Sequence, residues 1–257
     1  MRIYDIVVPD NLFDSMGYRD CTVILPTYKE AGNIQKMALR LRELYPDISI
    51  LILDDNSDDG SKELIEELND PMIAFTERDP DDRGLSASIF QGIRDTETEF
   101  FVNMDCDFQH PPEAVADAYA SLKEGADLCV GIREKRTALS PVRWFASWGA
   151  QFLTAMTLWL RDKKKSKDIM SCFFGGRPEI YQRVIEQNWN NVDKRGFKAL
   201  FDLLKFGPSD ADIRESTFEF RKREAGDSKL NKNTAISILR QCEPFGKLMG
   251  RVLEILT

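Results

Sequence analysis

Residues 99–112 read EFFVNMDCDFQHPP, a short apolar run followed by two closely spaced carboxylates. The run 100–104 predicts a buried strand, and the two prolines at 111–112 can begin a helix. Asp105 and Asp107 are therefore expected on a loop at the carboxyl end of a strand, where a ligand can reach them. An acidic pair of this kind also occurs in solvated loops, so the surrounding sequence has to decide its role.

The same order of strand, loop and helix repeats on both sides of this stretch. Apolar runs predict strands at 21–25, 48–53, 72–76, 100–104 and 128–132, and helical spacing predicts helices at 34–44, 61–68, 85–94 and 115–122. Ser61 is expected to cap the second helix. This alternation predicts an α/β fold with a Rossmann-like, mostly parallel sheet and helices on both faces.

Three acidic or polar loops fall at the carboxyl ends of predicted strands, at residues 26–30, 54–60 and 105–109. Ligands of open α/β sheets bind at that edge. Carboxylates can accept hydrogen bonds from a base or a ribose, but they repel phosphates unless a cation mediates. Asp105 and Asp107, with the Gln109 carbonyl as a third oxygen ligand, suit a hard divalent cation. The three loops together predict a nucleotide whose diphosphate is held through a metal ion.

Composition and charge exclude several other classes of protein. The 257-residue chain has a net charge of −8, which argues against nucleic acid as a partner. Five widely spaced cysteines without a secretion signal suit a reducing cytosol. His110 is the only histidine, which argues against an imidazole-based triad and favours a structural role for that ring. We expect an extension at 1–20, a catalytic domain at 21–230 and a C-terminal helical segment at 231–257.

Four ordered motifs resemble family 2 glycosyltransferases of the GT-A fold, and most closely the dolichol-phosphate mannose synthases. They are LPTYKEAGNI at 25–34, DDNSDDG at 54–60, DCDFQHPP at 105–112 and GIR at 131–133; RGLS at 83–86 is similar to a further motif. Asp58 stands where this family usually has proline, and Ser86 where it has glycine.

The resemblance implies a nucleotide-sugar donor and a Mg²⁺ or Mn²⁺ cofactor. It assigns the metal to Asp105, Asp107 and Gln109. The implied donor-binding residues are Pro26, Tyr28, Glu30, Asp54, Asp55, Arg83, Asp105 and Cys106.

The second half of the domain, 134–230, carries the predicted acceptor site. An uncharged run at 144–160 predicts an amphipathic helix over 143–161, with aromatic residues on one face and Ser147, Gln151 and Thr154 on another. Basic residues flank it at 143, 161, 163–165 and 167. This pattern fits an interfacial helix at a membrane surface, and equally a core helix beside a solvated basic loop. Segments 147–151 and 168–173 resemble polyprenyl-phosphate enzymes, with Trp148 and Cys172 replacing arginine and glycine.

A predicted strand at 217–220 leads into the basic segment 221–230, RKREAGDSKL, which can clamp a phosphate. Residues 223–230 also resemble the phosphate-binding segment of the polyprenyl-phosphate enzymes. Helices are expected at 235–239 and 248–256. The implied acceptor-phosphate ligands are Arg133, Arg143, Ser147, Arg223 and Lys229, and the catalytic group is Asp105, Asp107, Arg223 and Lys229.

The expected activity is transfer of mannose from GDP-mannose to a polyprenyl or dolichyl phosphate, with inversion. A phosphate monoester has a second pKa near ~6, so this acceptor needs no general base. The alternatives are a glucosyl- or GlcNAc-transferase that uses a UDP-sugar, and a non-catalytic membrane-peripheral scaffold. A processive synthase would carry a Gln-x-x-Arg-Trp segment, which is absent. The resemblance places the protein on the cytoplasmic face of a membrane, bound directly or through a membrane-embedded partner subunit.

Overall fold

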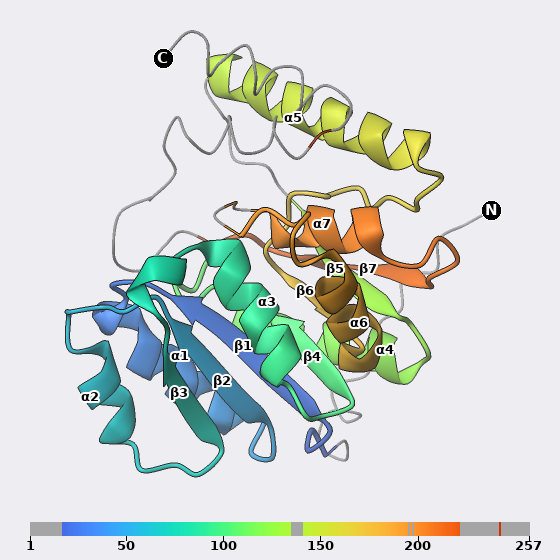
Figure 1. Ribbon diagram of the computed structural model, residues 1–257. Coiled ribbons are helices and arrows are strands. Elements are labelled where there is room, and N and C mark those ends of the chain that lie inside the picture. Colours follow the sequence, from blue (N-terminus) through green and yellow to red (C-terminus); the bar gives the residue numbers. More distant parts are fainter. Residues whose placement is uncertain (1–16, 135–140, 195, 197, 222–241, 243–257) are drawn as a thin grey trace, which may run out of the picture.

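The computed structural model describes residues 17–134, 141–194, 196, 198–221 and 242; at 141–148 and 150 it describes the backbone alone. Its centre is a seven-stranded sheet in the order β3-β2-β1-β4-β6-β5-β7 (Figure 1). The strands are β1 (Cys21–Thr27), β2 (Ser49–Asp54), β3 (Ile73–Glu77), β4 (Phe100–Asn103), β5 (Leu128–Arg133), β6 (Phe174–Gly176) and β7 (Ile213–Phe218). The strands of this sheet pair in parallel except for β6, which runs antiparallel to both β4 and β5. The predicted mostly parallel α/β sheet is confirmed.

Helices cover both faces of this sheet, because successive strand residues point to opposite sides. Val23 and Leu25 of β1 join one apolar core with α1 (Ala31–Leu44) and α4 (Val115–Lys123). Ile24, between them, joins the other core with α3 (Leu85–Asp95), α6 (Pro178–Asn188) and α7 (Ala199–Phe206). The remaining elements are α2 (Ser61–Glu66), α5 (Pro141–Leu160) and two short 3₁₀ turns, η2 (Pro80–Asp82) and η3 (Pro112–Ala114).

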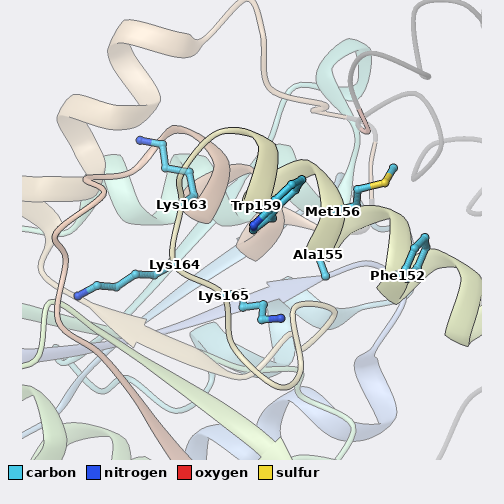
Figure 2. A pocket seen from close by; sticks show the side chains of 7 residues that line it. All are labelled: Phe152, Ala155, Met156, Trp159, Lys163, Lys164 and Lys165. Atoms are coloured by element: carbon cyan, nitrogen blue, oxygen red, sulfur yellow. The ribbon is translucent and has the colours of Figure 1, made fainter.

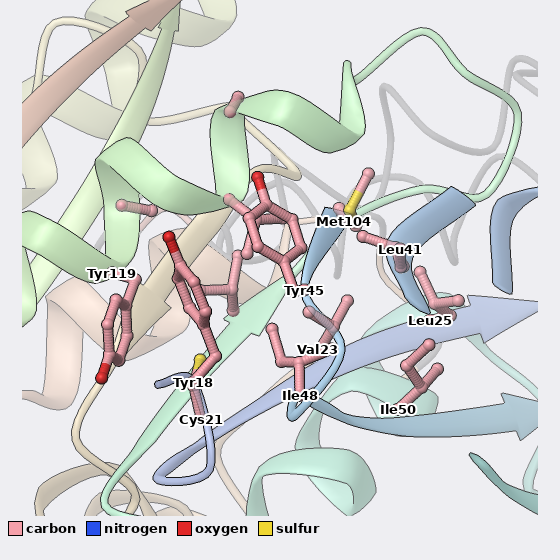
Figure 3. Packing of buried hydrophobic residues seen from close by; sticks show 14 of the residues in the cluster. Tyr18, Cys21, Val23, Leu25, Leu41, Tyr45, Ile48, Ile50, Met104 and Tyr119 are labelled. Atoms are coloured by element: carbon pink, nitrogen blue, oxygen red, sulfur yellow. The ribbon is translucent and has the colours of Figure 1, made fainter. Parts of the chain in front are cut away.

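Tyr18 belongs to the first core although it precedes the predicted start of the catalytic domain at residue 21. Its ring packs against Tyr45 and Tyr119, with centroids 4.7 Å from each (Figure 3). Cys242 is also buried, against the second core. The C-terminal helices expected at 235–239 and 248–256 lie outside the described residues.

Five local features differ from the sequence-based expectation. Strand β6 and helices α6 and α7 were not predicted. The strand expected at 217–220 begins four residues earlier, at Ile213, and ends at Phe218. Ser61 does not cap α2, because its hydroxyl donates to Asp59 while Gly60 takes the cap position in a left-handed conformation.

Gly175 explains why β6 fits between two other strands. A Cβ atom there would lie 2.7 Å from the carbonyl oxygen of Phe101 on β4. Only glycine allows this approach. The strand is three residues long, too short to leave a periodic signal in the sequence.

Candidate functional site

The three predicted loops lie at one edge of the sheet, because they follow the carboxyl ends of parallel neighbours. Thr27 at the end of β1 pairs with Asp54 at the end of β2, and Ile24 pairs with Asn103 at the end of β4. The loops after β1, β2 and β4 are therefore adjacent in space. This is the arrangement that the sequence predicted.

The loop after β4 is compact and is held by its own hydrogen bonds. The main-chain N–H of Asp105 donates to His110 Nδ1 at 3.1 Å, and that of Gln109 donates to Asp107 Oδ1 at 3.0 Å. Phe108 between them has a φ of 63°, a left-handed conformation that reverses the chain. Asp107 is buried, whereas the side chain of Asp105 is 33% exposed. Cys106 points into the first core.

His110 has a structural position beneath this loop. Its ring centroid lies 5.7 Å from that of Phe173, 5.4 Å from that of Phe218 and 5.9 Å from that of Phe220. Burial lowers the pKa of the imidazole to about 4, against the opposing charge of Asp107. The ring is therefore neutral near pH 7, so its 3.7 Å approach to the Asp105 carboxylate is not an ion pair. The neutral Nδ1 accepts the hydrogen bond from the Asp105 amide.

The side chains on this loop are of the types that bind a hard cation, but they do not form a complete coordination shell. Asp105, Asp107 and Gln109 carry only oxygen acceptors and amide donors. The main-chain carbonyl of Gln109 already accepts the N–H of Arg221 at 3.1 Å. Within the described ranges no three His, Cys, Asp or Glu side chains gather as a metal cluster. Two carboxylates on one loop can thus supply part of a coordination shell, and a bound diphosphate would have to supply more.

The Tyr28 ring, on the loop after β1, is contacted by two basic side chains, one from the same loop and one from the segment after β3. The guanidinium of Arg83 lies 5.3 Å from the Tyr28 ring centroid, and Lys29 Nζ lies 5.8 Å from it. Arg83 also donates to the main-chain and side-chain oxygens of Asn56, at 2.9 and 3.0 Å. Both Tyr28 and Arg83 are accessible at the edge where a nucleoside would bind.

Asp54 and Asp55 are buried, and each is occupied by donors of this chain. Asp54 accepts from the Thr27 hydroxyl at 3.0 Å and from the amide and hydroxyl of Ser57 at 2.6 and 2.8 Å. Asp55 forms an ion pair with Arg78 and accepts from the Gly84 amide at 2.9 Å. These two carboxylates hold the loops on which Tyr28 and Arg83 stand.

The other predicted donor residues, Pro26 and Glu30, lie on either side of Tyr28. Pro26 is buried within β1, paired with Leu53. Glu30 accepts from the Asn33 side chain at 2.9 Å, and its carbonyl receives the first amides of α1.

Of the predicted acceptor residues, the structure brings one to the predicted metal loop, which is the loop after β4 that carries Asp105, Asp107 and Gln109. Arg133 ends β5 and is paired with Asp168, and its guanidinium lies 5.4 Å from the ring centroid of Phe220. Arg143 and Ser147 belong to α5, where their side chains are not described. Arg223 and Lys229 lie outside the described residues. The described segment after β7 ends at Arg221, whose amide donates to the Gln109 carbonyl.

Two charged residues near the loop were not predicted as site residues. Asp168 was noted only within a motif, and Lys198 carried no sequence signal beyond its place in a basic run. Lys198 Nζ donates to the Met170 carbonyl at 2.9 Å. Burial, and after it the charge of Asp105, raises the pKa of the Cys172 thiol to about 11, against the opposing charges of Lys198 and Arg133. Asp105, Arg133, Asp168 and Lys198 are therefore each close enough to Cys172 to act on its thiol electrostatically.

A second accessible feature is the pocket at the C-terminal end of α5. Its lining residues are Phe152, Ala155, Met156, Trp159 and Lys163–Lys165 (Figure 2). Trp159 is 76% exposed, whereas Thr154 and Thr157 are buried. In the described part of α5 the aromatic residues Phe152 and Trp159 are thus exposed, and the two threonines are covered. Both threonine hydroxyls bond helix carbonyls, of Gln151 and Leu153, which permits their burial.

The known proteins to which this chain is similar are glycosyltransferases. Residues 22–185 match the family model described as glycosyl transferase family 2. The chain is 31% identical over 240 residues to a dolichol-phosphate mannosyltransferase of Mycosarcoma maydis, covering 86% of this chain and 77% of that protein. It is 30% identical over 235 residues to the enzyme of that name from Saccharomyces cerevisiae, covering 86% and 84%.

A solved structure with a similar fold is glucosyl-3-phosphoglycerate synthase from Mycobacterium tuberculosis, in complex with Mn²⁺ and UDP. The TM-score is 0.57 at 16% identity, with 86% of this chain and 79% of that chain covered. The likeness confirms the GT-A fold.

Proposed function

This chain belongs to glycosyl transferase family 2, and on that basis we propose that it transfers mannose from GDP-mannose to a polyprenyl phosphate such as dolichyl phosphate. Two relatives at 31% and 30% identity, both named dolichol-phosphate mannosyltransferases, support this choice of sugar and acceptor. The observation that carries the proposal is the hydrogen bond from the Arg221 amide to the Gln109 carbonyl. Through this contact the basic segment 221–230 begins against the loop that would hold the donor diphosphate.

The donor would bind at the edge formed by the loops after β1, β2 and β4. We assign the base and ribose to Tyr28, Glu30 and Arg83, since these side chains are at least partly accessible. Asp54 and Asp55 would act mainly by fixing the two loops, because their carboxylates accept several internal hydrogen bonds. Pro26 and Cys106 are buried and would shape the floor of the donor site.

Asp105, Asp107 and Gln109 are the residues that would hold Mg²⁺ or Mn²⁺. Their oxygen-rich side chains fit such an ion, and the fold neighbour with Mn²⁺ and UDP supports the choice. Bound there, the ion would neutralise charge on the departing nucleoside diphosphate.

In the reaction, an oxygen of the acceptor phosphate attacks the anomeric carbon from the face opposite the diphosphate. A carbon–oxygen bond to the acceptor forms as the bond to the diphosphate breaks, and the electron pair leaves with the nucleoside diphosphate. The acceptor is already largely dianionic near neutral pH, so no side chain has to remove a proton. Arg133, Arg143, Ser147, Arg223 and Lys229 would instead orient the nucleophile.

The acceptor is a lipid, so the protein has to meet a membrane surface. Among the described helices, none has the length and apolar character required to cross a bilayer. We assign membrane contact to the end of α5, where the exposed Trp159 lies beside Lys163–Lys165 (Figure 2). Leu160, which ends the helix, is exposed as well. Exposed tryptophan beside lysine is typical of residues that lie at the headgroup level.

One assay tests the proposed function and separates it from its alternatives. The full chain is incubated with a short-chain polyprenyl phosphate in detergent, Mg²⁺ or Mn²⁺, and GDP-mannose, UDP-glucose or UDP-GlcNAc. Lipid-linked mannose formed from GDP-mannose, and lost with EDTA, is the expected result. Transfer from a UDP-sugar but not from GDP-mannose would show that the donor is that UDP-sugar. No transfer and no nucleotide binding would favour a scaffold.

A further inference from the structure

The buried carboxylate of Asp168 determines how Arg133 is held at the end of β5. Asp168 Oδ2 lies 2.9 Å from Arg133 Nε and 2.8 Å from its Nη2. On its other side the guanidinium lies over the Phe220 ring at 5.4 Å. A guanidinium that contacts a carboxylate and an aromatic face is restricted in orientation, and its N–H groups that do not meet Asp168 could bind a ligand.

The carboxylate itself is fixed by its segment. Asp168 is 2% exposed, and its amide donates to the Ser166 hydroxyl at 3.3 Å while its carbonyl accepts from Ser171 at 3.1 Å. Two residues further on, the Met170 carbonyl accepts from Lys198 Nζ at 2.9 Å. This anchoring leaves Asp168 little freedom to follow Arg133. The arginine has to take its orientation from the carboxylate.

Asp168 is not satisfied by this one contact. Its Oδ1 is buried and has no hydrogen-bond partner among the described residues. A buried carboxylate with an unpaired oxygen is unfavourable for folding, and such groups persist where they serve a site. Arg133, by contrast, keeps 30% of its side chain exposed, so a ligand can reach the guanidinium.

The pair lies beside the metal loop. The Phe220 ring, which the Arg133 guanidinium contacts at 5.4 Å, packs against His110 with centroids 5.9 Å apart, and His110 Nδ1 accepts the Asp105 amide. Cys172, whose carbonyl is bound by Asn103 at the end of β4, is influenced by the charges of Arg133, Asp168 and Lys198 and by Asp105. Arg133 therefore has a position from which it can reach a phosphate next to the donor diphosphate.

We propose that Asp168 is a positioning residue that acts through Arg133: it fixes the guanidinium in the orientation that binds the acceptor phosphate. The inference rests on the proposed function, since it requires a phosphate acceptor. Asp168 itself is buried and would touch neither substrate. Its loss should weaken acceptor binding while leaving donor binding as it is.

The test is a double-mutant cycle on steady-state kinetics, with GDP-mannose and a short-chain polyprenyl phosphate varied in turn. Asp168→Asn keeps the shape but removes the charge that pairs with Arg133, which weakens the contact. We expect acceptor KM to rise about tenfold, as for a lost hydrogen bond to a charged group, and donor KM to stay within twofold. Because Asp168 acts only through Arg133, the double variant Asp168→Asn/Arg133→Gln should be no worse than Arg133→Gln alone.

Asp70→Asn is the matched control. It removes the carboxylate of another arginine pair, Arg42–Asp70 at 2.8 Å, which joins α1 to the turn after α2. Both KM values should stay at the wild-type level. Melting temperatures of the variants show whether each is folded at the assay temperature.

Four outcomes can be told apart. The positioning role would be overturned if the increases in acceptor KM of the two single variants multiply in the double variant. It would also be overturned if Asp168→Asn leaves the acceptor KM unchanged. Should Asp168→Asn fail to fold, Arg133→Gln still decides, because an unchanged acceptor KM there would leave Asp168 nothing to position. A wild-type chain that uses no polyprenyl phosphate would overturn the proposed function and this inference with it.

Discussion

At the residue scale, the loop after β4 shows how one side chain can be exposed to ligand while its neighbour supports the turn. Asp105 is partly exposed, and Asp107 is buried with one oxygen bonded to the Gln109 amide. The spacing of the two carboxylates was visible in the sequence. Their different environments were not, because they depend on the left-handed turn at Phe108 and on the ring of His110 below it.

Replacing Asp107 by asparagine should remove metal-dependent donor binding without unfolding the chain. The change takes away one charged oxygen ligand, and we expect GDP to bind at least ~10-fold more weakly in Mn²⁺. Calorimetric titration with GDP, with and without EDTA, measures the effect. Asp95→Asn, on the exposed end of α3, is the control. If the variant and wild type bind GDP with equal affinity and EDTA changes neither affinity, no metal ion takes part in donor binding at this site.

The lowered pKa of the buried His110 should make the stability of the fold depend on pH. Burial lowers its pKa from 6.5 to about 4 in the folded chain. Below pH 6.5 the unfolded chain takes up a proton that the folded chain refuses, so unfolding becomes easier as pH falls from 6.5 towards 4. The full loss would be on the order of 3 kcal/mol. Above pH 6.5 this contribution is complete.

Urea unfolding at pH 7, 6 and 5 in EDTA measures this dependence. His110→Gln, which keeps a polar acceptor near the Asp105 amide, should unfold with a shallower loss of stability across that range. Parallel pH profiles for the variant and wild type would show that another group titrates.

At the element scale, α5 shows a result that helical periodicity had left open. The aromatic stripe was compatible with a core helix and with an interfacial one. Phe152, Trp159 and Leu160 are exposed, while Leu158 packs into the second core and Thr154 and Thr157 are buried. A hydrophobic pattern tells which residues share a face, but only the neighbouring elements decide which face is covered. Figure 1 shows α5 next to α7 at the edge of the domain.

Trp159→Ser should weaken binding to vesicles of phosphatidylcholine and phosphatidylglycerol. The substitution removes an exposed aromatic ring beside Lys163–Lys165, and we expect a several-fold loss of membrane partitioning in co-sedimentation. Leu39→Ser is the control, because Leu39 is 52% exposed on α1, away from this surface. A similar loss from both substitutions would refute a specific role for α5.

At the scale of the whole molecule, the first core reaches beyond the predicted start of the catalytic domain. Tyr18, Tyr45 and Tyr119 form an aromatic group that joins the segment before β1 to α1 and α4 (Figure 3). The three rings come from distant parts of the chain. Sequence periodicity cannot detect such a contact, since it reports on one element at a time.

Two tyrosine substitutions in this aromatic group should change the free energy of unfolding differently. The hydroxyl of Tyr18 is buried and has no partner among the described residues, so Tyr18→Phe should be neutral or stabilising. The hydroxyl of Tyr119 donates to Asp20 at 2.6 Å, so Tyr119→Phe should cost about 1–3 kcal/mol. Chemical denaturation of both variants gives the comparison. A larger loss for Tyr18→Phe would mean that its hydroxyl has a partner.

The sequence by itself determined the family, the order of β1 to β5 and the three loops at their carboxyl ends. It could do so because strands, amphipathic helices and loop motifs are local patterns of residue type. The tertiary structure decided that β6 enters the sheet antiparallel through Gly175, and that Asp54 and Asp55 are bonded to their own loops. It also brought Asp168 and Lys198 to the metal loop from segments without a periodic signal. These results depend on contacts between residues far apart in the chain, and only packing in three dimensions can select among them.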